Sequence, residues 1–587
     1  MTAPDPKTAW RQYQKQAGAA DITVGLAASF TVDPLEPYLG AHLLAKNLKP
    51  EFSQAPFNQL QQLCLNHKHA VGDPDVIVML WRIEDLFGAK LAATLDSADA
   101  LPALLDDIRQ FAASVAQLRR NFSGTLVLST PPFPSLPGFD ALELTSPAMQ
   151  VYTAAAQAWA QEAAKIDRLR MLDLQALMTE HGARNANDAR KWQLYRQPYT
   201  ETFWQAIGTQ AGRIIAAEKI AAKKCVVLDL DNTLWGGVIG EDGLGGIALG
   251  DEFPGRAFRD FQRYLMHLKS RGVMLAVASK NNPEDAYEVF DRHDAMVLSR
   301  RDVVAFEINW ESKVDSIKRI AAKLNIGLDA LVFVDDNPKE IGEVQERLPA
   351  VTCILVPEEL ADLPALLSRT DLFDTLQVTD EDRKRTEMIA ADQQRSAVQE
   401  TTSEEDFRKS LQLKIDIFAA EKQHLARITQ LVNKTNQFNL TTIRRTQDEI
   451  EKLAASPDAL VLGMNIADKY GDYGLVGVAI LTKNGAIADI DTLLMSCRVL
   501  GRGAEETFIA QLAVAAASLG CTSLRGKYTP TTKNDMVKDL YARFKFAPDG
   551  DGWVLKTVDA AGIPAHIDAS LRLPESPILD KNKEGKK

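Results

Sequence analysis

Short apolar runs alternate with segments of helical periodicity along the first 200 residues of the chain. Strands are predicted at Ile22–Leu26, Val76–Trp81 and Thr125–Leu128. Helices are predicted between and after them, at Pro102–Leu118 and Ser146–Ala164. This alternation predicts a separate α/β domain over residues 1–200.

A second series of apolar runs begins near residue 220, and each run ends in polar residues. The runs that start at Cys225, Leu275 and Leu331 are typical of buried strands in a parallel sheet. Polar residues follow them directly: Asp229 and Asp231, then Ser279, then Asp335 and Asp336. Because ligands bind at the carboxyl ends of such strands, these side chains are candidates for one site.

The chemistry of these positions favours phosphoryl transfer. Asp229 and Asp231 can hold a divalent cation, with one carboxylate poised to attack and the other to move a proton. Asp-x-Asp also occurs in ordinary turns and calcium loops, so the pair alone leaves both interpretations open. Lys313 lies early in a helical segment that runs to about Leu324, and its ammonium can offset the charge of a phosphoryl group beside an aspartate. The series taken in order favours the phosphoryl-transfer interpretation.

The last part of the chain carries a second chemical signal. Two apolar strands, Leu475–Leu481 and Ala486–Met495, flank a Lys-Asn-Gly turn and predict a hairpin. The second strand is followed by a glycine-bearing turn and an alanine-rich helix from about Ala504. That turn contains the residues Arg498, Gly501, Arg502 and Gly503. A turn of this kind before a helix presents backbone N–H groups to an anion.

Cys497 stands directly before this turn. A free cysteine is more often a small buried residue than a nucleophile, although Arg498, Arg502 and the helix start favour a thiolate. Asn436 and Asn439 can hydrogen-bond a polyhydroxy acyl group or equally cap the helix that ends near Lys434.

The set Asp229/Asp231, Ser279, Lys313 and Asp335/Asp336 resembles the four motifs of the haloacid dehalogenase (HAD) superfamily. The longer run Leu228-Asp229-Leu230-Asp231-Asn232-Thr233-Leu234-Trp235-Gly236-Gly237 is similar to the FkbH-type branch (HAD subfamily IIIC), as are Asn433–Thr441 and Ser496–Gly503. The resemblance covers most of residues 220–550.

This resemblance implies a set of residue roles. Asp229 is expected to accept the phosphoryl group, and Asp231 to act as general acid and then base. Mg²⁺ is expected at Asp229, the backbone carbonyl of Asp231, Asp335 and Asp336. The residues expected to bind phosphate are Ser279, Lys280, Asn281 and Lys313. Arg498, Gly501, Arg502, Gly503, Asn436 and Asn439 are expected to bind the pantetheine arm or the acyl group.

The resemblance also implies a reaction. FkbH-type proteins are glyceryl transferase/phosphatases that prime acyl carrier proteins, which suits polyketide biosynthesis. A phosphorylated acyl donor resembling 1,3-bisphosphoglycerate would acylate Cys497, lose its remaining phosphate at Asp229, and pass the glyceryl group to the phosphopantetheine of a carrier protein. Two alternatives stay open: a phosphatase with a non-catalytic C-terminal scaffold, and an acyl-CoA-dependent acyltransferase.

The expected architecture is multidomain α/β. A Rossmann-like HAD core over residues 220–358 follows a degenerate SGNH-like domain over residues 1–200. A charged helical connector (359–410) leads to a GNAT-like α+β domain (411–560), and residues 573–587 form a flexible tail. The segment between Asp229 and Ser279 leaves little room for a cap domain. Ser29, at the place of the SGNH nucleophile, lacks the expected Asp-x-x-His partner, so a structural serine is the favoured interpretation.

Composition sets the outer bounds. A length of 587 residues suits three to four domains, and hydrophobic and charged contents of 46% and 25% are those of ordinary globular proteins. The formal net charge of −12 disfavours a nucleic-acid partner. The sparse cysteines and the lack of a signal or long apolar run predict a cytoplasmic protein with no membrane contact.

Overall fold

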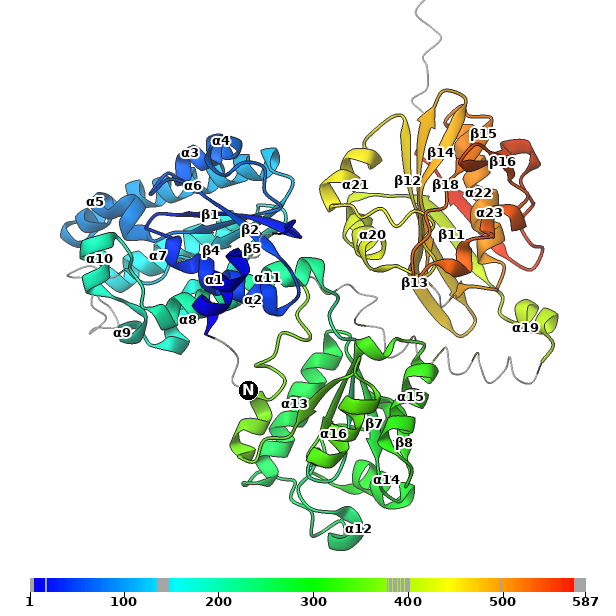
Figure 1. The fold of residues 1–587 in the computed structure, drawn as a ribbon, viewed down its shortest axis with the longest axis horizontal. Helices are drawn as coiled ribbons and strands as arrows, with labels where there is room; N and C mark the ends of the chain where they lie inside the picture. Colours follow the sequence, from blue (N-terminus) through cyan, green and yellow to red (C-terminus); the bar gives the residue numbers. More distant parts are fainter. Residues whose placement is uncertain are drawn as a thin grey trace, which may run out of the picture. The chain divides into compact units, whose positions relative to one another are not determined.

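The computed structural model describes residues 5–15, 18–134, 147–376, 402–496 and 499–574, together with residues 378, 383, 388, 391 and 395. The chain divides into two compact units, Met1–Ala221 with Asp374–Leu376, and Ala222–Phe373 with Gln377–Lys587. Three β-sheets define an N-terminal domain (5–221), a central domain (222–373) and a C-terminal domain (402–574) (Figure 1). No helix of the described segments has the length and apolar character needed to cross a membrane.

The N-terminal domain contains a five-stranded parallel sheet with the order β2-β1-β3-β4-β5. Its strands are β1 (Ile22–Ala28), β2 (Pro50–Gln54), β3 (Val76–Leu80), β4 (Thr125–Ser129) and β5 (Leu169–Leu172). The three predicted strands are all present. The strands β2 and β5 had no clear apolar run to reveal them, since both carry exposed or half-exposed residues.

Helices cover both faces of this sheet (Figure 1). They are α1 (Pro6–Gln14), α2 (Glu36–Ala45), α3 (Leu60–Leu65), α4 (His67–Val71), α5 (Ile83–Asp96), α6 (Leu101–Asn121), α7 (Pro147–Ala163), α8 (Leu174–His181), α9 (Ala183–Ala186), α10 (Ala189–Tyr195) and α11 (Glu201–Lys219). The buried residues Phe203, Trp204 and Ile207 of α11 pack with Leu39 and Leu43 of α2. The domain therefore extends past residue 200, to the end of α11.

The central domain is built on a second parallel sheet, with the order β10-β9-β6-β7-β8. Its strands are β6 (Cys225–Leu228), β7 (Met274–Ser279), β8 (Val303–Ile308), β9 (Leu331–Asp335) and β10 (Thr352–Leu355). The three predicted strands occupy the middle of the sheet and are fully buried, which explains their unbroken apolar runs. The strands are parallel and therefore end at one edge of the sheet. The strand order reverses between β6 and β9, because β7 and β8 lie on one side of β6 and β9 and β10 lie on the other.

The helices of the central domain are α12 (Ile239–Asp242), α13 (Gly255–Ser270), α14 (Pro283–Arg292), α15 (Lys313–Leu324) and α16 (Pro338–Arg347). The helices α13 and α14 pack on one face of the sheet, and α15 and α16 on the other. Between β6 and β7 the chain forms loops, α12 and α13, so no cap domain is inserted there.

Residues 359–373 belong to the central domain rather than to a charged connector. They form a 3₁₀ helix (Leu360–Ala365) and turns instead of the predicted α-helix. Leu363, Leu367 and Phe373 are buried in the same core as α13. Their burial extends the central domain beyond the predicted boundary at residue 358. Most of residues 377–401 lie outside the described part of the chain, which resumes with α19 (Glu404–Ser410).

The C-terminal domain has an eight-stranded mixed sheet with the order β16-β17-β15-β14-β13-β12-β11-β18. Its strands are β11 (Lys414–Ala419), β12 (Ala459–Asp468), β13 (Gly471–Asn484), β14 (Ile487–Met495), β15 (Ser523–Gly526), β16 (Ala547–Asp549), β17 (Gly552–Lys556) and β18 (Asp568–Arg572). The predicted hairpin is β13–β14. Because β18 pairs with β11, the domain continues past the predicted end at residue 560.

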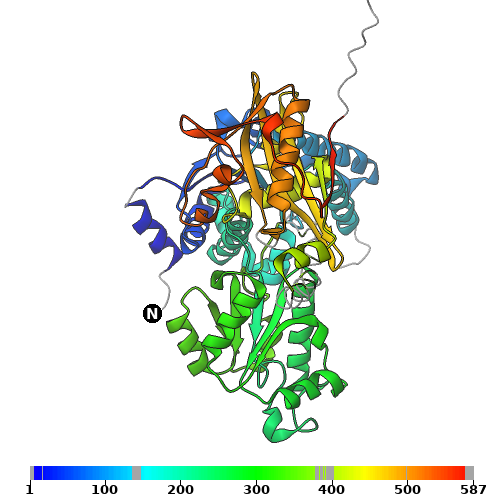
Figure 2. The same ribbon diagram turned by 90° about the vertical axis from the view of Figure 1, so that its right-hand side faces the viewer.

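Helices pack on both faces of this sheet as well. On one face lie α20 (Lys422–Lys434) and α21 (Gln447–Ala454), and on the other lie α22 (Ala504–Ser518) and α23 (Leu540–Arg543). The helix α22, orange in Figure 2, runs along the strands and is buried over most of its length. Of the predicted tail, residues 575–587 lie outside the described part of the chain.

Candidate functional site

Three carboxylates meet at the carboxyl edge of the central sheet. Asp229 directly follows β6, and Asp335 and Asp336 stand at the end of the adjacent strand β9. One carboxylate oxygen from each of the three lies within 4.8 Å of the others. Because the two strands are parallel neighbours, residues distant in the chain converge there, as the sequence predicted.

Lys313 lies between two of these carboxylates. It is the first residue of α15, whose N-cap Ser312 accepts a hydrogen bond from the Val314 N–H. Its Nζ is 2.9 Å from Oδ2 of Asp229 and donates to Oδ2 of Asp335. Burial alone would lower the pKa of Lys313, but the charges of the two aspartates outweigh it and raise this pKa. The lysine is therefore held as a cation.

The acidic cluster fits a divalent cation with oxygen ligands. Oδ1 of Asp229 is buried and has no hydrogen-bond partner among the described residues, while Oδ2 is held by Lys313. Burial and the Asp229 charge raise the pKa of both Asp335 and Asp336. One ammonium does not balance three carboxylates, so a hard cation such as Mg²⁺ would stabilise their ionised forms.

Asp231 is not part of this cluster, and its carboxylate accepts hydrogen bonds from other residues. Its Oδ1 accepts hydrogen bonds from Nε1 of Trp235 at 2.8 Å and from the Ile239 N–H at 3.1 Å. Its Oδ2 accepts a bond of 2.8 Å from Nδ2 of Asn281. Burial raises the pKa of Asp231, which favours its protonated form. Asp229 and Asp231 therefore lie in different surroundings: Asp229 belongs to the cluster of carboxylates, and Asp231 has a raised pKa and is a candidate proton donor.

The residues expected to bind phosphate differ in what they contact. Ser279 ends β7 and is buried at the same sheet edge. Lys280 donates from Nζ to Oε1 of Glu340 at 2.6 Å, so its ammonium is engaged in an ion pair. Asn281 is buried and orients Asp231. Asn281 therefore contacts the candidate acid Asp231, and its expected contact with phosphate stays a prediction.

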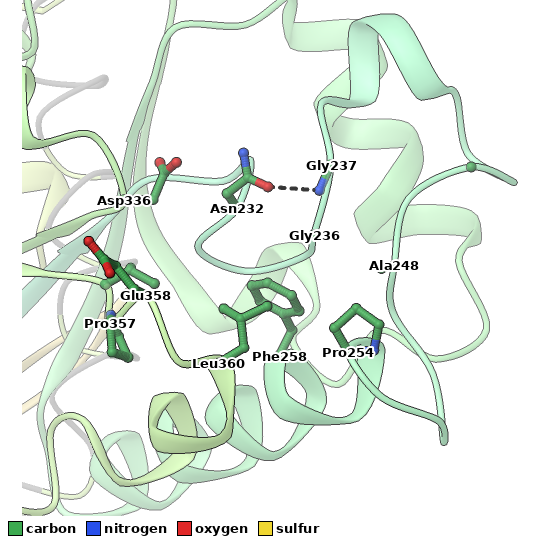
Figure 3. A pocket seen from close by; sticks show the side chains of 12 residues that line it. Asn232, Gly236, Gly237, Ala248, Pro254, Phe258, Asp336, Pro357, Glu358 and Leu360 are labelled. Atoms are coloured by element: carbon green, nitrogen blue, oxygen red, sulfur yellow. Dashed lines mark hydrogen bonds between the residues drawn. The ribbon is translucent and has the colours of Figure 1, made fainter.

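A pocket of about 460 Å³ adjoins the acidic cluster (Figure 3). Asp336 and Asn232 lie on one side of it, and Phe258 and Leu360 on the opposite side. Its lining comprises Asn232, Gly236, Gly237, Gly246, Ala248, Pro254, Phe258, Asp336, Val356, Pro357, Glu358 and Leu360. Among these described lining residues none is cationic. The pocket offers an apolar surface beside the acids.

Several residues that build this site were not among the predicted site residues. Trp235, Phe258 and Leu360 are apolar residues whose roles depend on the packing of distant segments. Only Trp235 carried a local signal, because it follows Asp231 by one helical turn.

The glycine turn of the C-terminal domain is partly described. Gly501 and Gly503 adopt positive φ values of 75° and 91°, and α22 begins directly after them. Arg502 donates to the hydroxyl of Tyr473. Cys497 and Arg498 lie outside the described residues. The predicted order of strand, glycine turn and helix is present.

The two asparagines expected near this turn have structural contacts. Asn439 is fully buried, donates to the Thr435 carbonyl at the end of α20, and accepts from the Thr442 N–H. Oδ1 of Asn436 accepts a bond from Arg444. The contact of Asn439 matches the helix-capping alternative of the sequence analysis, whereas Asn436 contacts a side chain.

Ser29 of the N-terminal domain is part of a buried charged cluster. Its hydroxyl donates to Oδ2 of Asp85 at 2.8 Å and accepts from the Arg82 N–H. Arg82 pairs with the Asp85 carboxylate and stacks over the Trp192 ring. Because the Ser29 hydroxyl both donates and accepts a hydrogen bond within this cluster, we assign Ser29 a structural role.

Among the solved structures that resemble this chain is one that contains a phosphatase domain. The N-terminal part of the protein BF1531 from Bacteroides fragilis, which contains a phosphatase domain and is complexed with Mg, is 28% identical to this chain with a TM-score of 0.55. The similarity covers 63% of this chain and 98% of that structure, a larger share than the central domain alone can supply.

Other solved structures resemble the chain more weakly. A GNAT-family acetyltransferase from Streptococcus pneumoniae is 16% identical, covers 24% of this chain and 96% of its own, and has a TM-score of 0.19. Spermidine N-acetyltransferase from Vibrio cholerae, in complex with CoA and spermine, is 15% identical over 25% of this chain and 97% of its own, with a TM-score of 0.20. Matches at these TM-scores support no conclusion about the C-terminal domain.

No family model and no curated protein matches the chain. The three sheets and the similarity to the phosphatase-containing structure confirm the predicted multidomain α/β class, with a phosphatase-type parallel domain at its centre.

Proposed function

We propose that the central domain is a Mg²⁺-dependent phosphatase that works through an aspartyl-phosphate at Asp229. The observation that carries this proposal is the state of the Asp229 carboxylate, whose Oδ2 is bound by Lys313 while the buried Oδ1 has no partner among the described residues. The 28% identical structure with a phosphatase domain and Mg supports the same reading.

The residues divide the reaction between them. A carboxylate oxygen of Asp229 attacks phosphorus, and the bond from phosphorus to the ester oxygen breaks. Asp231 gives its proton to that departing oxygen, then takes a proton from the water that attacks the aspartyl-phosphate. Inorganic phosphate leaves and Asp229 is regenerated.

Other groups balance charge and position the substrate. Mg²⁺, held by Asp229, Asp335 and Asp336, would supply positive charge against the phosphoryl oxygens. Lys313 contributes a fixed cation, and the Ser279 hydroxyl lies at the same edge to hydrogen-bond a phosphoryl oxygen. The pocket lined by Phe258 and Leu360 gives room for the organic group attached to phosphate.

The phosphatase proposal has a direct test. Purified protein is incubated with a panel of phosphate monoesters, with Mg²⁺ or with a chelator, and released phosphate is measured. Release that depends on Mg²⁺ supports the proposal. Equal release with the chelator, or none from any ester, contradicts it.

We further propose that this phosphatase serves an acyl transfer of the FkbH type. Cys497 would attack the acyl carbon of a donor resembling 1,3-bisphosphoglycerate, expelling phosphate and forming a thioester. After the second phosphate is removed, the thiol of a carrier-protein phosphopantetheine would attack that thioester and release the Cys497 thiol. The strand, glycine turn and α22 that follow one another around residue 497 support this proposal.

Intact-protein mass spectrometry tests the acyl transfer. Incubation with Mg²⁺ and bisphosphoglycerate should give a glyceryl adduct on Cys497, absent from Cys497→Ala. Cys521→Ala is the matched control in the same domain, because Cys521 is buried and burial raises the pKa of its thiol. Phosphate release without any adduct would contradict the acyl transfer and support the alternative, a phosphatase with a non-catalytic C-terminal scaffold.

A further inference from the structure

The pocket beside the acidic cluster is lined by negative charge without positive charge. Asp336 and Glu358 contribute carboxylates, and the lining residues include no lysine, arginine or histidine. Glu358 lies three residues after β10 and is exposed to solvent. The Val356 N–H donates to the Asp335 carbonyl at 2.9 Å, which fixes the start of this loop beside the acids. The charge of Glu358 is therefore held on the wall of the pocket.

Most residues that line the pocket have no backbone N–H with which to bind an anion. Pro254 and Pro357 lack this group altogether. Five other lining residues donate their N–H groups to acceptors within the protein: Gly236, Gly237, Gly246, Ala248 and Val356. An anion that leaves water needs hydrogen-bond donors or a cation in exchange, so this lining is poorly suited to one.

The acidic cluster leaves no surplus positive charge for a second anion. Lys313 pairs with Asp229 and Asp335, and Asp336 completes the cluster. The ammonium and one Mg²⁺, as proposed above, together just balance the three carboxylates, and the phosphate brings negative charge of its own. A second anionic group on the substrate would therefore lie near the Glu358 carboxylate without a compensating cation.

An uncharged group with hydroxyls fits the same lining. Oδ1 of Asn232 accepts a hydrogen bond of 2.9 Å from the Gly237 N–H, which fixes the orientation of the amide (Figure 3). The NH₂ of this amide can donate to a hydroxyl oxygen, and the Glu358 carboxylate can accept from a hydroxyl. Phe258 and Leu360 offer an apolar surface to the carbon atoms.

We infer that this pocket selects monophosphate esters of uncharged alcohols and excludes esters whose organic part carries a carboxylate or a second phosphate, with Glu358 as the specificity-determining residue. The inference rests on the proposed phosphatase and names its substrate class. In the proposed acyl transfer the carboxyl carbon is held in a thioester when the phosphate reaches Asp229, so that substrate has no second anion either.

Two esters that differ by one charge test the inference. Glycerol 3-phosphate and 3-phosphoglycerate share a three-carbon skeleton, and a hydroxymethyl group in the first replaces the carboxylate of the second. We expect kcat/KM for glycerol 3-phosphate to be higher by roughly tenfold or more, mainly through KM, because like charges repel in the pocket. Added salt should narrow this ratio, because it screens the repulsion. An equal or higher kcat/KM for 3-phosphoglycerate overturns the inference.

A charge series at position 358 tests the role assigned to this residue. Glu358→Gln removes the negative charge and Glu358→Lys reverses it, and an exposed position tolerates both changes. We expect kcat/KM for 3-phosphoglycerate to rise by about threefold in Glu358→Gln and by about tenfold or more in Glu358→Lys. The value for glycerol 3-phosphate should change by less than about threefold, since its organic part has no charge.

Glu346 provides the matched control for this series. It is exposed on α16 of the same domain and lies outside the pocket lining. Glu346→Gln and Glu346→Lys make the same charge changes and should leave the ratio between the two esters as in the wild type. A ratio that Glu358→Lys does not change, or that Glu346→Lys changes equally, overturns the inference.

Direct binding separates this inference from the phosphatase proposal. If neither ester is hydrolysed, the phosphatase proposal fails, and calorimetric titration of the wild-type protein with Mg²⁺ and each ester still tests the pocket. Binding of glycerol 3-phosphate should then be tighter by roughly tenfold, and Glu358→Lys should reduce the difference. Equal binding of the two esters, tighter binding of 3-phosphoglycerate, or no binding of either contradicts the inference.

Discussion

The ammonium of Lys313 lies 2.9 Å from Oδ2 of Asp229, while Oδ1 of the same carboxylate is buried and has no partner among the described residues. Lys313 also donates to Asp335, so a single cation bridges two buried acids that come from different strands. The remaining negative charge of the cluster is the physical basis for the proposed cation and nucleophile.

Lys313→Met should destabilise the central domain and make it dependent on Mg²⁺. Removing one partner of a buried ion pair leaves uncompensated charge and costs roughly 3 kcal/mol or more. Thermal unfolding should show a lower melting temperature, with a larger rise on adding Mg²⁺ than in the wild-type protein.

Lys318→Met in the same helix is the control for this change. Lys318 is half-exposed and pairs with Asp315 at 3.5 Å, so its loss should change stability by less than about 1 kcal/mol. Equal melting temperatures for the two variants would argue against a buried charge balance at Asp229 and Asp335.

Asn281→Ala should slow phosphate release without weakening the metal site. Asn281 donates to Oδ2 of Asp231, and its loss frees one side of the proposed acid. A misplaced acid lowers kcat by roughly tenfold to a hundredfold, with the Mg²⁺ concentration for half-maximal activity unchanged. The neighbouring Asn282 is exposed and donates to Asp285 instead, so Asn282→Ala should keep the wild-type rate. Identical rates for the two variants would remove Asn281 from the site.

Leu360→Trp should fill part of the pocket and select against large esters. We expect KM for 4-nitrophenyl phosphate to rise by roughly tenfold and KM for acetyl phosphate to change little, because one methylene-sized mismatch already costs about 1–3 kcal/mol. Leu355→Trp is the control, since Leu355 is 43% exposed and lies outside the pocket lining. Parallel changes in both KM values would show that the pocket does not hold the organic group.

Asp302→Asn should destabilise the central domain at neutral pH and not at low pH. Burial would raise the pKa of Asp302, but hydrogen bonds from Lys269 and Ser299 outweigh it and hold this pKa below its usual value. The stabilisation is therefore present above the unfolded pKa of about 4 and is lost as pH falls through the folded pKa.

Thermal unfolding measured at several pH values tests this predicted pH dependence of stability. At pH near 7 the loss of a charge-assisted bond should cost about 1–3 kcal/mol, and the difference from the wild type should narrow below pH of about 4. Asp291→Asn, at an exposed pair with Arg300, should have little effect at either pH. A difference that widens in acid would contradict the assignment.

The local sequence was sufficient to predict the three strands that carry the polar residues of the site. The cores of β6, β7 and β9 are buried on both faces, so each appears as an unbroken apolar run that ends at its polar residue. Edge strands such as β10 have mixed exposure and give no such run. The resemblance in motif order then supplied the roles.

Contacts between residues far apart in the chain could not be predicted from the sequence. Lys280 stands next to Ser279, yet its ammonium pairs with Glu340 on α16, a contact that only the packed sheet creates. The predicted charged helical connector began at residue 359, whereas Leu363 and Leu367 pack into the core of the central domain. Asn439 could bind or cap, and only its contact with the Thr435 carbonyl favours capping.

Phosphate release by Asp229→Asn in the presence of Mg²⁺ tests the central claim most directly. The account predicts a loss of roughly a thousandfold or more relative to the wild type, because amide nitrogen and oxygen cannot replace the nucleophilic carboxylate. The exposed Asp251→Asn, in the same domain, should retain the parental rate. Turnover by Asp229→Asn at the wild-type rate would contradict the account.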